Sequence, residues 1–163
     1  MCEVSVRDEL ESDQRFDERY VKPESVVRLN AWLGFPEDRF SQDWEIENSN
    51  SDRIGEFLTL YEQQELKDDD RFALMALIVA SFDECLLVDK ANESLARRIR
   101  AYLVRDSKLH EATMHYWCVE GESDPEFMFR ATPFIRETWN VLKSNEDQTG
   151  ILSRRERPER TKG

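Results

Sequence analysis

Two pairs of acidic residues are the side chains of this sequence whose types and spacing could do chemistry. Asp83 and Glu84 lie side by side near the end of a long apolar stretch, and Glu62 and Glu65 form an E-x-x-E pair upstream of it. A carboxylate within an apolar helix is costly unless a cation or a donor balances it. Two neighbouring helices that each carry such a pair can chelate a divalent ion, here Mg²⁺.

The arrangement resembles the site of all-α nucleotide pyrophosphohydrolases of the MazG kind. That resemblance implies a divalent-metal-dependent hydrolase of nucleotides, with Glu62, Glu65, Asp83 and Glu84 as the metal ligands. The sequence departs from the family pattern, because it has neither the doubled glutamate of the first helix nor the E-x-x-D motif of the second. Asp83-Glu84 is instead followed by Cys-Leu-Leu-Val-Asp89.

A structural interpretation of Asp83 and Glu84 competes with the metal site, and we favour it. Both carboxylates either face solvent at the end of their helix or pair with an arginine. The arginines considered as partners are Arg97, Arg98 and Arg136. Arginines at 97, 98, 100 and 105 line one face of the next predicted helix, where surface ion pairs are the simplest interpretation.

The other candidate residues favour packing over chemistry. His110 and His115 are five residues apart and so lie on different faces of a helix, and Cys118 beside Trp117 is typical of a buried thiol. Asp68-Asp-Asp70 is typical of a capped helix start. The chain has no glycine-rich phosphate loop, GxSxG, HExxH or GxGxxG motif, and we expect no cofactor outside the metal hypothesis.

The charge of the chain is strongly negative and unevenly spread. The net charge is −12, and the last thirteen residues carry five basic and two acidic side chains, so residues 1–150 carry −15. A body this acidic repels nucleic acid and favours a basic protein partner or a cation. Three cysteines without a CxxC pair, no signal peptide and no apolar run of membrane-spanning length predict a cytoplasmic protein without a membrane partner.

The element that must position these residues is a helix predicted over residues 70–88, which is apolar on nearly every side. Such a helix belongs at the centre of a domain, with other helices around it. Further helices are predicted over residues 23–34, 52–66, 92–106, 109–119 and 132–145. Pro23 and Gly34 mark the two ends of the first of these, and Asn92 caps the fourth helix in chain order.

These patterns predict an all-α, single-domain bundle of about six helices at residues 21–145. Residues 1–20 are expected to form a disordered or frayed acidic arm and residues 146–163 a disordered basic tail, with one short extended segment as an option near residues 127–131. The favoured function is a non-enzymatic acidic protein-binding module, of the inhibitor, immunity or adaptor type, that acts on a basic partner. The alternative is the metal-dependent nucleotide hydrolase.

Overall fold

The computed structural model describes residues 19–36, 41–63 and 65–155, and within these ranges the chain is an all-α bundle without a strand. The fold class predicted from the sequence is therefore confirmed. The helices are α1 (Pro23–Leu33), α2 (Trp44–Glu47), α3 (Ile54–Tyr61), α4 (Asp68–Leu87), α5 (Glu93–Arg105), α6 (Glu111–Cys118), the 3₁₀-helix η1 (Pro125–Phe127) and α7 (Thr132–Arg155). No strand forms near residues 127–131, where η1 ends at Phe127 and the next residue, Met128, is extended.

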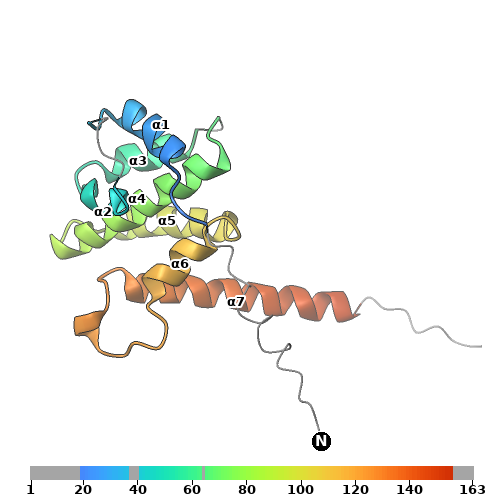
Figure 1. Cartoon of the computed structure of the whole chain (residues 1–163). Helices are drawn as coiled ribbons and strands as arrows, with labels where there is room; N and C mark the ends of the chain where they lie inside the picture. The colour runs from blue at the N-terminus through green and yellow to red at the C-terminus, as the bar shows by residue number, and fades with distance from the viewer. Residues whose placement is uncertain (1–18, 37–40, 64, 156–163) are drawn as a thin grey trace, which may run out of the picture.

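Helix α4 lies at the centre of the bundle, as its apolar sequence predicted (Figure 1). Thirteen of its twenty residues are buried, and α1, α2 and α3 all pack against it. Leu74, Leu77 and Ile78 are fully buried, which shows that α4 has no continuous solvent-facing side. No helix in the described part of the chain is long and apolar enough to cross a membrane.

The two ends of α1 follow from the signals in its sequence. Pro23 occupies the first turn, where its missing N–H has no helical partner. Gly34 ends the helix with φ at 69°, a left-handed conformation that glycine adopts without strain. The backbone N–H of Phe35 then donates to the carbonyl oxygen of Asn30 at 2.9 Å. Trp44 of α2 donates its indole N–H to the Asn30 side chain at 2.9 Å, so α1 and α2 are joined in the core.

The acidic first turn of α4 binds cationic side chains from α1 and from the segment that precedes α1. Asp70 is 1% exposed and accepts two hydrogen bonds at 3.0 Å from Nε of Arg28 and one at 2.7 Å from its Nη2. Asp69 accepts a hydrogen bond from Nζ of Lys22 at 2.9 Å and lies 3.4 Å from Arg19. The capping role predicted for the three aspartates is wrong, because the N-cap residue of α4 is Lys67 and no side chain caps it; the aspartates do lie in the first turn, at the positive end of the helix, as predicted.

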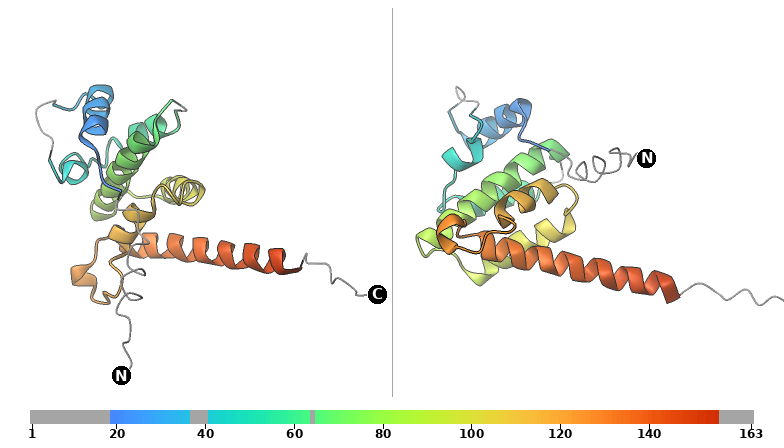
Figure 2. Two further views of the ribbon diagram at one scale, coloured as in Figure 1. Left: turned by 45° about the vertical axis from the view of Figure 1, so that its right-hand side comes forward. Right: turned by 60° about the horizontal axis from the view of Figure 1, so that its bottom comes forward.

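Helix α7 is longer than the sequence predicted. It was expected to end near Ser144 and Asn145, but it continues to Arg155 and extends past the other helices (Figure 2). Its first half packs against α5 and α6, whereas residues 143–150 are exposed. Between Asn145 and Arg155 the chain has no proline, and its one glycine there, Gly150, does not adopt a left-handed conformation. The acidic arm falls on residues outside the described ranges, except for Arg19 and Tyr20, and the tail beyond Arg155 also lies outside them.

Candidate functional site

The four carboxylates of the proposed metal site each lie in a different environment. Oδ1 of Asp83 accepts a hydrogen bond at 2.7 Å from the backbone N–H of Ala131, and Oε2 of Glu84 accepts one at 3.0 Å from the backbone N–H of Ser51. Both side chains are half-buried. Neither the solvent-facing interpretation nor the arginine pairing holds, because each carboxylate bonds a backbone amide where the chain leads into the next helix, α7 or α3.

Glu62 lies at the other end of α3 from these contacts. Its Oε1 accepts hydrogen bonds from Tyr102 at 2.6 Å and from Nη2 of Arg98 at 2.7 Å, and these two donors, Tyr102 first, hold the pKa of Glu62 below its usual value. Glu65 is exposed in the turn that follows. Since α3 runs antiparallel to α4, and its eight residues span about 12 Å, Glu62 and Glu65 are far from Glu84.

The structure thus does not bring Glu62, Glu65, Asp83 and Glu84 together. Across residues 19–36, 41–63 and 65–155, no three side chains of the metal-ligating types meet in a group that could hold an ion. The Mg²⁺ site would need the two pairs at the same end of α3, and the antiparallel packing places them at opposite ends.

The arginines near these acids serve structural contacts. Arg98 pairs with Glu62, and Arg100 with Glu137 of α7 at 2.9 Å, so α5 is tied to α3 and α7. Arg136 does not meet Asp83 or Glu84. Its guanidinium donates three hydrogen bonds of 2.7–2.8 Å to the carbonyl oxygens of Cys118, Val119 and Glu122, at the end of α6. It therefore joins α7 to the end of α6 and to the turn that follows it.

The two histidines lie in different environments: His110 is in the core, whereas His115 and Cys118 line a common pocket beside α7. His110 is fully buried, and its Nε2 lies 2.7 Å from the hydroxyl of Tyr61, which donates to Asp106 at 2.7 Å. Burial lowers the pKa of His110 to about 4, so its ring is neutral at pH 7. His115 is exposed. Burial raises the pKa of the Cys118 thiol, which fits the packing role predicted from the sequence.

A pocket of about 650 Å³ opens between the segment before α1, the start of α2, α4 and α6. Its lining is formed by residues 19–21, 41, 42, 45, 72, 76, 112, 113, 116 and 117, and we call it the Glu45 pocket. Its volume lies within the range of small-ligand sites. Phe72 and Trp117 give it apolar walls that are themselves almost fully buried.

Two polar atoms of the Glu45 pocket are buried without a hydrogen-bond partner: Oε2 of Glu45 and Oγ1 of Thr113. Thr113 is only 5% exposed. Burial raises the pKa of Glu45, a hydrogen bond from its own backbone N–H opposes the shift, and the negative charge of Asp43 adds to it. Unpaired buried polar groups cost free energy and are rare in folded proteins, so the two in this pocket make it the candidate site.

The rim of the Glu45 pocket is aromatic and accessible. Tyr20 is 65% exposed and Tyr116 is 58% exposed. Tyr116 is held by ring contacts to Trp117 and Phe129, with centroids 5.7 and 5.5 Å away. Aromatic residues of this kind are enriched where proteins bind one another.

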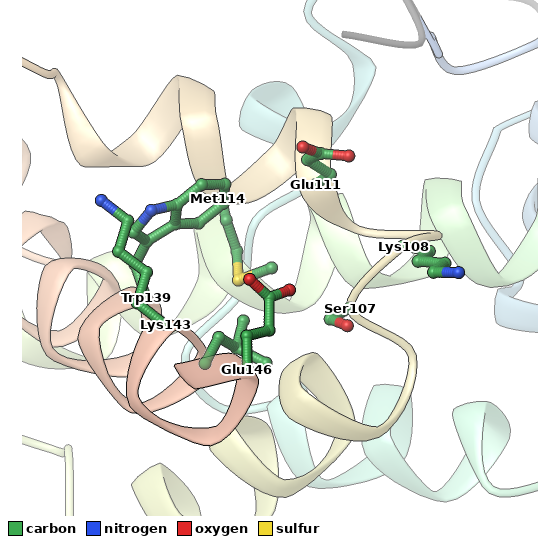
Figure 3. Close-up of a pocket in the computed structure, with 8 residues that line it drawn as sticks. Ser107, Lys108, Glu111, Met114, Trp139, Lys143 and Glu146 are labelled. Carbon is green, nitrogen blue, oxygen red and sulfur yellow. The ribbon is translucent and has the colours of Figure 1, made fainter. Parts of the chain in front are cut away.

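A second pocket, of about 260 Å³, lies between the α5–α6 turn, α6 and α7 (Figure 3). Met114 and Trp139 are part of its apolar lining. Two lysines and two glutamates also line it: Lys108, Lys143, Glu111 and Glu146. These charges cancel, and none of its side chains carries a buried polar atom without a partner. The unpartnered polar atoms distinguish the Glu45 pocket from this one, and we take the Glu45 pocket as the candidate site.

Comparison of the chain with protein-family models, with curated proteins and with solved structures finds no match. The sequence predictions also missed Glu45 and Thr113. The mixed pattern around Trp44 and Ile46 held one clue, but a helix of only four residues is too short to reveal which side chains point inward. For Thr113, the only signal was its position between Ala112 and Met114, on a predicted helix with two apolar faces.

Proposed function

We propose that this chain is a non-enzymatic binding module that holds a basic protein partner at the Glu45 pocket. The observation that carries the proposal is the buried, unpartnered Oε2 of Glu45 among apolar and aromatic side chains. A carboxylate in that position is under-satisfied in the free protein. A cationic side chain entering the pocket would supply the missing donor and the missing charge.

The overall charge supports the same partner. The −15 charge of residues 1–150 attracts a basic protein over a distance of about a Debye length and speeds its association. The same charge argues against a nucleic acid partner. The exposed rings of Tyr20 and Tyr116 would supply the apolar contact area around the charged centre that stable interfaces need.

A reducing, cytoplasmic setting is part of the proposal. Cys85 and Cys118, the two cysteines in the described ranges, are free thiols and both are buried. Burial raises the pKa of each thiol, so neither is poised to react.

Site-specific photocrosslinking in extracts of the source cells tests the proposal. The variant Tyr116→p-benzoylphenylalanine places the crosslinker on the rim of the pocket, and Trp32→p-benzoylphenylalanine places it on α1, at a residue that is 50% exposed and outside the pocket. We expect a crosslinked protein of high isoelectric point from position 116 and not from position 32, and we expect added salt to weaken the product.

A crosslinking pattern that is the same at both positions would overturn the proposal, and so would a partner as acidic as this chain. Adding Glu45→Gln to the position-116 variant should reduce the yield of the crosslinked partner, because the change removes the buried negative charge and nearly keeps the shape of the side chain. An unchanged yield would show that the partner does not use Glu45.

A further inference from the structure

We infer that the group that enters the Glu45 pocket is the primary ammonium of a lysine side chain from the partner. The inference rests on the proposed function and specifies which cation the pocket accepts. A lysine is an ammonium on a flexible aliphatic stem. The pocket offers a partner for each of these two parts.

The acceptors available in the pocket suit an ammonium better than a guanidinium. Oε2 of Glu45 and Oγ1 of Thr113 are buried and unpartnered, and a threonine hydroxyl can rotate to accept a hydrogen bond. Lysine carries three N–H donors that rotate freely, whereas arginine carries five in a rigid planar fork. Two acceptors leave one ammonium N–H to be solvated at the mouth, but they leave most of a guanidinium unpaired.

The walls suit the stem of a lysine. Phe72 and Ala76 of α4 and Trp117 of α6 are buried and apolar, and they line the same pocket as Glu45 and Thr113. Lysine methylene groups pack on such surfaces while the ammonium reaches a polar group. Aromatic rings near the ammonium add cation–π attraction, which grows where water is excluded.

Among the described residues, Glu45 is the one acidic residue that lines the pocket. Asp43 lies close enough to Glu45 to raise the pKa of its carboxyl. Arg19 also lines the pocket, and its Nη1 lies 3.4 Å from Oδ1 of Asp69 on α4, whose Oδ2 binds Lys22. Glu45 is half-buried and its Oε2 has no hydrogen-bond partner, so a cation is the group that complements it best.

A titration monitored by ¹H–¹⁵N correlation spectra tests this inference with the full chain. The probes are Nα-acetyl-lysine N-methylamide, its Nζ-acetylated and Nζ-trimethylated forms, and the corresponding arginine amide. We expect the lysine probe to shift the backbone signals of residues 45, 113 and 116. It should bind at least about tenfold more tightly than the acetylated form, which has lost the charge, with the trimethylated and arginine probes in between.

Three variants assign the contacts. Glu45→Gln should weaken binding of the lysine probe by about tenfold or more, and Thr113→Val, which removes only the hydroxyl, by several-fold. Glu126→Gln, an exposed acid of η1 outside the pocket, should leave the affinity unchanged. Well-dispersed spectra of each free variant confirm that it is folded.

The possible results separate the inference from the proposed function. If the arginine or acetylated probe binds as tightly as the lysine probe, or if Glu45→Gln has no effect, the lysine inference is overturned. A basic partner crosslinked at position 116 would then still support the proposed function. If the lysine probe binds but position 116 crosslinks no basic protein, the proposed function is overturned. The inference that a lysine of a protein partner enters the pocket is then overturned as well.

Discussion

The carboxylate of Asp83 in α4 accepts a hydrogen bond 2.7 Å long from the backbone N–H of Ala131, the residue that leads into α7. Ala131 is fully buried, so no water can replace this contact. On the adjacent position of α4, Glu84 does the same for Ser51, ahead of α3. The acids that suggested a metal site are thus the points at which α4 fixes the starts of two other helices.

Asp83→Ala should destabilise the fold by about 1–3 kcal/mol, because the buried N–H of Ala131 loses its acceptor. Asp83→Asn keeps a carbonyl oxygen in place and should cost less. The free energy of unfolding from urea titrations measures both effects. Glu126→Ala, at an exposed acid, is the control and should stay within about 0.5 kcal/mol of the wild type. A cost for Asp83→Ala no larger than this control would contradict the anchoring role.

Arg28→Met should be among the most destabilising single changes in the chain, at about 3 kcal/mol or more. The reason is that it leaves the carboxylate of Asp70, 1% exposed, without its cation. The double variant Arg28→Met/Asp70→Leu removes both charges and should recover much of that loss. Urea unfolding of the wild type, both single variants and the double variant completes the cycle. Additive losses would show that the two residues do not interact.

The stability of the fold should fall as the pH drops from about 6.5 to 4, in part because of His110. Its pKa is lowered by burial to about 4, so in this pH range the histidine is protonated in the unfolded chain and neutral in the folded chain. Above pH 6.5 His110 does not lower the free energy of unfolding, and towards pH 4 it lowers that free energy by up to about 3 kcal/mol. His110→Gln should flatten this part of the pH profile, while His115→Gln, at an exposed position, should not. Equal profiles for the two variants would rule the assignment out.

Glu45→Gln should raise the melting temperature at pH 7 although it weakens partner binding. The pKa of Glu45 is raised, chiefly by burial. The charged carboxylate therefore lowers the free energy of unfolding at every pH above that pKa. As the pH falls through the raised pKa, the wild type becomes protonated and the gap between the two proteins should close. Asp43 and Arg19 are the charged neighbours to keep unchanged. A variant that melts lower than the wild type at pH 7 would argue that Glu45 is structural.

Val119→Gly should be more stable than Val119→Ala by about 1 kcal/mol. Val119 ends α6 with φ at 45°, a left-handed conformation that is strained for residues with a Cβ and free of strain for glycine. Both variants lose the valine side chain, so their difference isolates the backbone conformation. Thermal melts of the two variants measure it. Equal stability would mean that φ relaxes to a negative value in solution.

The sequence predicted the elements whose signals are local. Pro23 and Gly34 mark α1, Asn92 caps α5 by accepting a hydrogen bond at 2.8 Å from the backbone N–H of Leu95, and the apolar run marks α4. The end of α7 was missed because the chain after Asn145 contains residues that neither stop a helix nor bury against the body. Such a segment has no pattern to detect.

The site residues were harder to predict because their partners are remote in sequence. Asp83 and Glu84 bond backbone amides, and any residue except proline offers one, so the partner residue carries no mark of the contact. The separation of Glu62 from Glu84 could have been predicted from the sequence, because a short link between two helices makes them antiparallel and places those acids at opposite ends. Glu45 could be recognised only once the surrounding walls were assembled from four segments of the chain.

The bonds from Asp83 and Glu84 to backbone amides have a consequence for how the protein can change over evolution. A side chain that binds another side chain leaves a record in its relatives, because the two positions vary together. A side chain that binds the main chain leaves none, since position 51 can exchange serine for any residue that retains an N–H. Among relatives of this chain, positions 83 and 84 should stay acidic while no other position covaries with them. Contact maps inferred from covariation would then omit the bonds that hold the starts of α3 and α7 to α4.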